Sequence, residues 1–183
     1  SRKISEANLI ISKKTFKNGS QANLLYGITL NTYRFNKYFS ESKRYRNNYL
    51  KKINMISDDL ASVRKVWSRL KAVQQGVFLT RDLVSEPSNN LTPLLLAKEA
   101  LKLKKIGLKV NVLDEKELKK LKMGALLGVA QGSSNKPFVV TLEWKGNKSS
   151  NFEYSFIGKG VTFDTGGISI KPSGGMEEMK YDM

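Results

Sequence analysis

The stretch FIGKGVTFDTGGISIKPSGG, from Phe156 to Gly175, holds six glycines, two lysines and one aspartate near the end of the chain. The apolar run of residues 154–160 predicts a β-strand that ends within the first residues of this stretch. In open α/β sheets, ligands bind beyond the carboxyl ends of the strands. If the chain forms such a sheet, the stretch is a candidate ligand site.

The segments before this stretch alternate in the way an α/β sheet covered by helices requires. Gly107 is placed to end the first helix, and Asp114 with Glu117 resembles a capping box that begins the next one. We expect a central mixed sheet. In chain order we predict a helix over 94–107, a strand over 108–114, a helix from 115, a short apolar helix or turn over 123–133, and strands over 137–146 and 154–160.

The chain divides into three predicted parts. Residues 1–57 show a strand at 7–12, helical spacing of apolar residues between 21 and 39, and a strand at 53–57. Two strands and a helix bury too little apolar surface to fold alone, so we expect the C-terminal part of a domain that begins upstream. Residues 58–84 predict one linker helix and residues 85–183 the first part of a catalytic domain. The apolar stripe of that helix is Leu60, Val63, Trp67, Leu70, Val73, Val77 and Val84.

The composition removes several kinds of chemistry. The chain has neither cysteine nor histidine, which excludes disulfides, thiolate nucleophiles and every catalytic triad that depends on histidine. No apolar run reaches the roughly 18–20 residues of a membrane span, so we expect a soluble chain. Catalysis must then use carboxylates, lysines, hydroxyls, backbone amides or a metal ion held by hard ligands.

The net charge of +16 raises nucleic acid as an alternative partner. Clustered Lys and Arg release counterions from a phosphate backbone when they bind it. The plainer interpretation of such runs is a solvated surface, and basicity by itself favours that interpretation.

The glycine-rich stretch does not match two common nucleotide-binding motifs. A phosphate-binding loop would need glycine at position 153 and a hydroxyl residue at 160, where the sequence has Glu153 and Gly160, and a dinucleotide fingerprint lacks its third glycine. Asp164 precedes a glycine pair, which predicts a tight, partly buried turn. A buried carboxylate requires a cation, and either nearby lysines or a metal ion can supply it. A purely structural ion pair remains the alternative.

Residues 158–183 carry a specific resemblance. The run GKGVTFDTGGISIKPS followed by GMEEMKYDM resembles the signature segment of the leucyl aminopeptidase, or cytosol aminopeptidase, family of dinuclear metallopeptidases. The runs TRDLVSEPSNNLTP at 80–93 and MGALLGVAQGS at 123–133 resemble the same family in the expected order. The resemblance covers residues 77–183 well and the earlier part loosely.

The resemblance implies a role for each polar residue of the segment. Lys159 and Asp182 would be ligands of one metal ion, Asp164 would bridge both ions, and Lys171 would donate to the oxyanion of the scissile peptide. Each subunit would hold two divalent ions, Mn²⁺ or Zn²⁺, with Mg²⁺ as a further candidate. Lys159 must be neutral to bind a metal ion, whereas Lys171 must stay protonated to stabilise negative charge.

Neighbouring residues and one missing motif complete the comparison with the family. Met179 matches a position that lines the pocket for the N-terminal side chain, and a core methionine is the equal alternative. Glu177 and Glu178 are expected to be first-turn acids that favour the helix dipole. The family's second acidic motif is absent before Met183. We therefore expect a fragment of a longer enzyme that is inactive by itself.

The resemblance predicts a metal-dependent leucyl aminopeptidase, a hydrolase that releases leucine and other large apolar residues from the N-termini of peptides. It implies a cytoplasmic homohexamer without a membrane partner. The alternatives are a nucleic-acid-binding role on the basic surface and an inactive structural paralogue.

Overall fold

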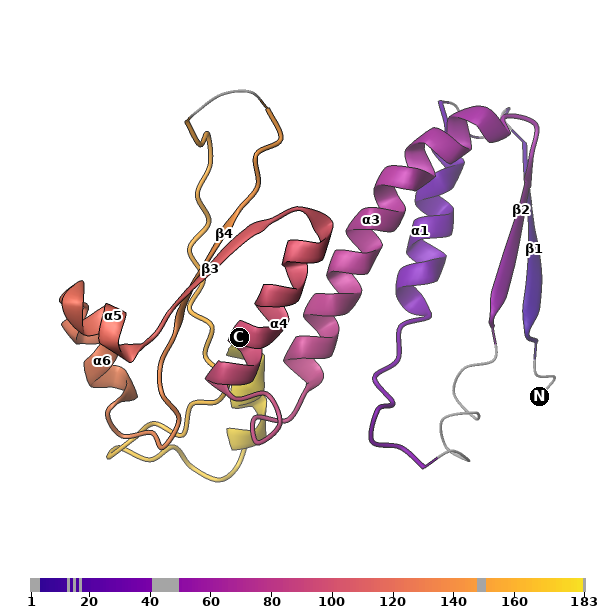
Figure 1. Cartoon of the computed structure of the whole chain (residues 1–183). Helices are drawn as coiled ribbons and strands as arrows, with labels where there is room; N and C mark the ends of the chain where they lie inside the picture. Colours follow the sequence, from indigo (N-terminus) through magenta and orange to yellow (C-terminus); the bar gives the residue numbers. More distant parts are fainter. Residues whose placement is uncertain are drawn as a thin grey trace. The chain divides into compact units, whose positions relative to one another are not determined.

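The computed structural model describes residues 4–12, 14, 16, 18–40, 50–147 and 151–182, with Asp182 described by its backbone only. The chain forms two compact units, Ser1–Asp82 and Leu83–Met183 (Figure 1). Within the described ranges, every helix is too short or too polar to cross a membrane. The predicted division at residues 57/58 and 84/85 stays a prediction.

The first unit pairs two strands in parallel. Strand β1 (Glu6–Ile11) lies beside β2 (Lys52–Ser57), with Glu6 opposite Lys52 and Ile11 opposite Ser57. Helix α1 (Gln21–Asn31) lies between them in the chain. Both strands agree with the sequence-based expectation. The prediction of helical structure as far as residue 39 was wrong, because α1 ends at Asn31. Beyond Asn31 the aromatic residues do not form the apolar face of a helix. The Tyr33 ring instead packs against a distant residue, with its centre 5.2 Å from that of the Phe78 ring.

Helix α3 (Leu60–Ser85) confirms the long amphipathic helix. Val63 is buried on its inner face, and the left-handed Gly19 lies so close to the Ser62 carbonyl that a side chain at Gly19 could not fit. The buried stripe is narrower than predicted. Leu60 and Val73 are 40% and 48% exposed, because they lie at the edges of the helical face rather than on its centre.

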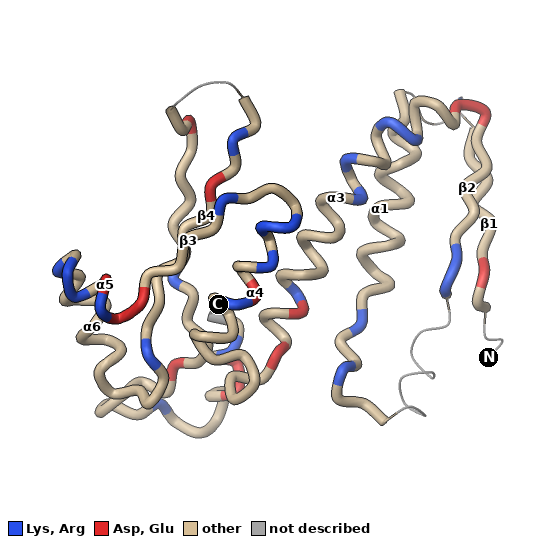
Figure 2. Tube along the Cα trace, viewed as in Figure 1, with Lys and Arg blue, Asp and Glu red and all other residues tan. Residues whose placement is uncertain are grey.

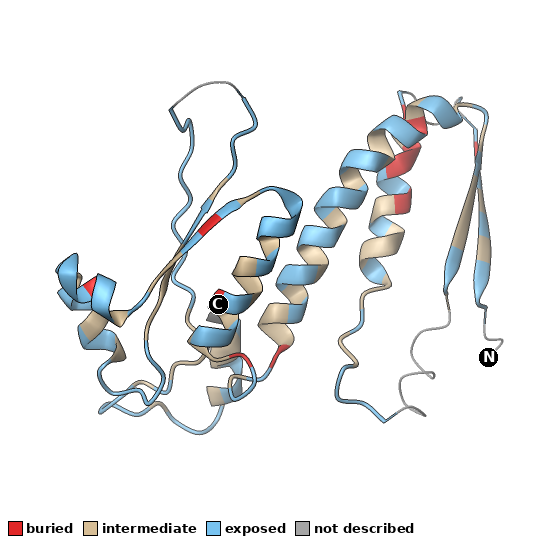
Figure 3. Ribbon diagram, in the orientation of Figure 1, coloured by how far each residue is buried: buried red, intermediate tan, exposed pale blue. Residues whose placement is uncertain are grey.

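The second unit pairs two strands in antiparallel orientation. Helix α4 (Pro93–Lys102) continues into the 3₁₀ turn η1 (Leu103–Ile106), and Gly107 ends it with φ of 95°. Strand β3 (Lys109–Leu113) then pairs with β4 (Val139–Glu143). The buried apolar residues of this unit, coloured red in Figure 3, are Leu91, Ala97, Val110 and Leu118.

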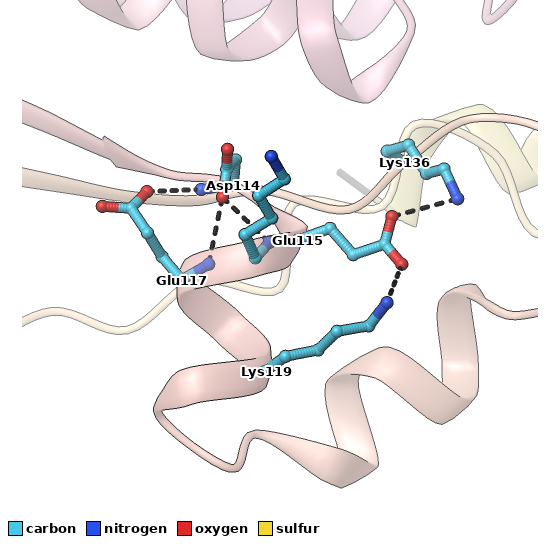
Figure 4. A network of polar contacts seen from close by, with 6 residues as sticks. Asp114, Glu115, Glu117, Lys119 and Lys136 are labelled. Carbon is cyan, nitrogen blue, oxygen red and sulfur yellow. Dashed lines mark hydrogen bonds and ion pairs between the residues drawn. The ribbon is translucent and has the colours of Figure 1, made fainter.

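Two short helices follow β3. Helix α5 (Glu115–Lys120) begins with the predicted capping box: the Asp114 carboxylate accepts from the Glu117 amide at 3.0 Å, and the Glu117 side chain accepts from the Asp114 amide at 2.9 Å (Figure 4). Leu118, one residue after the capping box, is completely buried. Helix α6 (Gly124–Ala130) is the predicted short apolar helix.

The strand predicted over residues 154–160 does not form. Residues 152–160 have no regular secondary structure, and Phe156 and Ile157 are 94% and 98% exposed. A strand requires a hydrogen-bonded neighbour, and the described part of the chain provides none beside this segment. The 3₁₀ helix η2 (Met176–Asp182) closes the described chain with Glu177 and Glu178 in its first turn. The arrangement of helices and strands confirms the α/β class.

Candidate metal and substrate site

The glycine-rich stretch folds back on itself between Thr165 and Lys171. The Lys171 amide donates to the Thr165 carbonyl at 2.9 Å, which closes the loop. Gly166 and Gly167 have φ of 91° and 71°, a left-handed conformation in which side chains are strained. A Cβ on Gly166 would also collide with the Ser169 carbonyl oxygen. The glycine pair is therefore required by the closure of this loop.

The Asp164 carboxylate is oriented from both of its oxygens. Oδ1 accepts the Gly166 amide at 2.9 Å, and Oδ2 lies 3.3 Å from the Lys171 ammonium. The hydrogen bond from Gly166 is the largest influence that holds the pKa of Asp164 below its ordinary value, and the contact with Lys171 is the next. The charge of Lys159 lowers this pKa further, whereas partial desolvation raises it. The carboxylate is thus ionised, and the loop backbone fixes its direction.

Lys171 connects the loop to η2. Its Nζ lies 2.8 Å from the Met179 sulfur in addition to its contact with Asp164, and its side chain is 32% exposed. A thioether is a weak acceptor. The ammonium is therefore held between a carboxylate and a weak acceptor, and a stronger acceptor could take the place of the sulfur.

The structure gives no side-chain contact for the other two predicted site residues, Lys159 and Asp182, among the described residues. Lys159 is exposed, and its carbonyl accepts the Val161 amide at 2.9 Å. Asp182 is the last residue of η2, and its side chain lies outside the described part of the chain. The structure thus brings together Asp164, Lys171 and Met179, with the charge of Lys159 acting on Asp164.

Comparison with known proteins matches this segment to one family. The catalytic domain described for the cytosol aminopeptidase family matches residues 78–183, which include the whole loop and η2. The chain belongs to the cytosol aminopeptidase family. A protein of Brucella anthropi named a probable cytosol aminopeptidase is 46% identical over 178 residues, and one of Sinorhizobium fredii with the same name is 47% identical over 167 residues.

The matches cover most of this chain and about a third of each relative. The Brucella match includes 96% of this chain and 36% of the relative, and the Sinorhizobium match 88% and 33%. Among solved structures, the bottromycin maturation enzyme BotP in complex with Mn superposes with a TM-score of 0.75 at 27% identity, over 94% of this chain and 36% of that one. The fold of this chain is therefore shared with about a third of BotP.

A cytosol aminopeptidase site requires donors for metal ions, and the residues present fit part of such a site. The described residues include no group of three or more acidic side chains close enough to hold an ion together. They do include an ionised Asp164 oxygen and an exposed Lys159 amine in one loop. Oxygen and nitrogen donors of this kind suit Mn²⁺, Mg²⁺ or Zn²⁺.

Sequence reasoning missed one buried cation beside this site. The Lys180 ammonium nitrogen is inaccessible to solvent and has no hydrogen-bond acceptor among the described residues. Burial lowers the pKa of Lys180, and the charge of the buried Glu86 opposes that shift. No pattern in the sequence separates Lys180 from the many exposed lysines, since its burial depends on the packing of η2.

Proposed function

We propose that the full-length protein is a metal-dependent aminopeptidase that releases N-terminal residues, leucine and other large apolar ones by preference, from peptides. Membership of the cytosol aminopeptidase family supports the reaction class. One observation carries the proposal at the level of atoms: inside the signature loop, the Lys171 ammonium lies 3.3 Å from the Asp164 carboxylate and 2.8 Å from the Met179 sulfur.

Lys171 is the proposed electrophilic residue. Its ammonium would donate to the scissile carbonyl oxygen as negative charge develops there, which is the interaction that lowers an acyl-transfer barrier most directly. Its contact with Met179 places this donor beside the residue proposed to line the pocket for the N-terminal side chain. An apolar substrate side chain against Met179 would therefore bring its own carbonyl toward Lys171.

Asp164, Lys159 and Asp182 are the proposed metal ligands. When bound, two divalent ions would supply Lewis-acid polarisation of the carbonyl and activation of a water molecule. Asp164 suits a shared ligand because the loop keeps it ionised and directs one oxygen away from the Gly166 amide. Lys159 would bind as a neutral amine. The ion identity, Mn²⁺, Zn²⁺ or Mg²⁺, and a cytoplasmic homohexamer belong to the same proposal.

The test uses the full-length protein with added Mn²⁺ and leucine p-nitroanilide. Lys171→Ala should lower kcat by about 10²–10³-fold, as the loss of one oxyanion donor does in other hydrolases. Lys119→Ala is the matched control, because it also removes a lysine that faces a carboxylate in the same unit. It should leave kcat within about twofold, as expected for a surface ion pair.

Two results would overturn the proposal. The first is a folded, metal-loaded protein that does not hydrolyse leucine, alanine or methionine amides. The second is a Lys171→Ala variant as active as the Lys119→Ala control.

A further inference from the structure

A cavity lies beside the two short helices of the second unit. Its volume is about 470 Å³, within the range of roughly 300–1,000 Å³ that is typical of small-molecule sites. Helix α5, helix α6 and the segment that follows α6 line this cavity, and every lining residue falls between positions 115 and 137. None of the lining residues belongs to the proposed peptidase site, so the proposed function does not account for the cavity.

Two glycines keep the cavity open. Gly124 and Gly128 lie about one turn apart on α6, and both line the cavity. A Cβ on either glycine would meet open space. Glycine is a poor helix former, so two glycines weaken this seven-residue helix. In return, the missing side chains leave room for a ligand.

Two ammonium groups meet at the wall of the cavity. Lys119 on α5 and Lys136 after α6 contact the two oxygens of the Glu115 carboxylate at 2.8 Å and 3.0 Å (Figure 4). Figure 2 shows the same charges as blue beside red along α5. Hydrogen bonds from Lys119 and then from Lys136 hold the pKa of Glu115 below its ordinary value, so its carboxylate is ionised. The three side chains together carry one net positive charge.

The contacts with Glu115 leave most of the donors on both lysines unused. An ammonium group has three N–H donors. Among the described residues, Glu115 is the one partner of Lys119 and of Lys136, whose side chains are 65% and 69% exposed. Glu115 therefore holds two cations close together without neutralising both, and each cation can donate to a further oxygen atom.

The rest of the lining is apolar or neutral. Leu127, Ala130 and Pro137 are half-buried and contribute aliphatic groups. Gln131 and Ser133 add an amide and a hydroxyl group. The ion pairs alone would be an ordinary surface cluster, but here they border a cavity with an aliphatic wall. A ligand with one negative charge and a short apolar body matches both parts of this lining.

We propose that this cavity binds a small monocarboxylate with a short aliphatic body. The ligand carboxylate would accept N–H donors from Lys119 and Lys136. Its aliphatic part would lie against Leu127, Ala130 and Pro137. Hydrogen bonds between charged groups are about twice as strong as those between neutral ones, and one negative charge neutralises the net charge of the site. A cationic ligand would instead face two ammonium groups.

The experiment titrates the full-length protein with 4-methylpentanoate and follows binding by ligand-observed NMR. EDTA removes metal ions, so that the carboxylate cannot bind at the proposed metal site, and KCl keeps the ionic strength constant. We expect a Kd of about 1 mM or lower. The uncharged 4-methylpentanamide should bind at least about tenfold more weakly, because it loses the charged hydrogen bonds. Acetate should also bind at least about tenfold more weakly, because it lacks the apolar body.

Two variants and one control locate the site. Lys136→Gln should weaken binding at least about tenfold. Lys109→Gln is the matched control: Lys109 faces Glu143 at 3.2 Å and is 75% exposed, but it lies outside the cavity lining, so its loss should change the Kd by less than about twofold. Gly128→Leu should fill the cavity and abolish binding. Leucine favours a helix more than glycine does, so α6 should persist, and circular dichroism spectra should match the wild type.

Three results would overturn the inference. The first is no saturable binding of 4-methylpentanoate up to about 10 mM, ten times the expected upper limit of Kd. The second is an equal loss in the Lys136→Gln and Lys109→Gln variants, which would reduce the effect to net charge. The third is binding that Gly128→Leu leaves unchanged, which would place the ligand elsewhere.

This inference and the proposed function can fail separately, since they share no residue. A full-length protein that binds 4-methylpentanoate through Lys136 but hydrolyses no amino-acid amide would support the cavity site and overturn the peptidase. A protein that hydrolyses leucine p-nitroanilide but does not bind the carboxylate would overturn the cavity site and leave the peptidase in place.

Discussion

Asp164 and Glu115 are both carboxylates that face lysines in the second unit, and they differ in what holds them. Glu115 contacts Lys119 at 2.8 Å and Lys136 at 3.0 Å on the surface beside α5 (Figure 4). Asp164 contacts one lysine at 3.3 Å and in addition accepts a backbone amide within a loop that two left-handed glycines close. Lysine contacts occur at both places, but the oriented backbone donor occurs only at Asp164.

The difference shows why an ion pair by itself does not identify a site. The Glu115 and Lys119 pair is one helical turn apart, a spacing that arises on many helix surfaces. Asp164 needs Gly166 and Lys171 at fixed positions, and Lys171 in turn contacts Met179 on η2. Four predictions test this comparison, from the largest expected effect to the smallest.

Replacing Asp164 by Asn should lower the affinity of the full-length protein for Mn²⁺ by more than about 100-fold. Even groups that only orient metal ligands typically contribute 10–100-fold, and Asp164 is proposed to be a ligand itself. Isothermal titration calorimetry measures the change. Glu115→Gln is the matched control and should bind Mn²⁺ as the wild type does; equal losses in the two variants would remove the distinction between these carboxylates.

Replacing Gly166 by Ala should open the loop. The left-handed φ and the collision with the Ser169 carbonyl together should cost about 2 kcal/mol, which accelerates exchange of the Lys171 amide about 30-fold. Hydrogen exchange followed by NMR measures that amide directly. Gly128→Ala, where a Cβ meets open space, should leave it unchanged. Unaltered exchange in the Gly166 variant would show that the loop does not depend on this glycine.

Replacing Asp114 by Ala should weaken the start of α5 by about 1 kcal/mol, the usual cost of losing an N-cap side chain. The Lys116 and Glu117 amides lose the acceptor that they share in the capping box, so their exchange should rise about fivefold. Asp114→Asn keeps an acceptor oxygen and should recover most of the protection. If Asn and Ala behave alike, the cap contributes little.

The smallest expected effect concerns Glu115. The hydrogen bonds from Lys119 and then Lys136 hold the pKa of Glu115 below its ordinary value. Because this pKa is depressed in the folded state, the stabilising contribution of Glu115 is present above the ordinary glutamate pKa of about 4.3 and is lost as pH falls through the lower folded value. NMR titration of the side chain should show this shift.

Removing the two lysines tests the cause of that shift. In the Lys119→Gln/Lys136→Gln variant, the pKa of Glu115 should return toward its ordinary value. A pKa that is the same with and without the two lysines would contradict the assignment.

Much of the fold could be predicted from local pattern. The capping box at Asp114, the helix end at Gly107 and the long helix α3 each depend on interactions within a few residues, so the sequence contains their signals. The helix beyond Asn31 and the strand over 154–160 were wrong for the opposite reason. Tyr33 packs against a residue 45 positions away, and a strand needs a neighbour that no local pattern supplies.

The candidate site divides in the same way. The glycine pair, the order of Lys159, Asp164 and Lys171 and the family itself could be recognised from the sequence alone, because fixed spacing in one short loop constrains the backbone. The contact of Lys171 with Met179 could not be predicted from the sequence, since it joins the loop to a separate helix. The burial of Lys180 was missed altogether.

The sequence by itself determined the family, the α/β class, the caps and the glycines of the loop, since all of these are properties of neighbouring residues. Only the tertiary structure decided which side chains meet: that Lys171 lies between Asp164 and Met179, and that the Lys180 ammonium is buried. The physical reason is that burial and contact depend on how elements distant in the chain pack, and local pattern does not encode that packing.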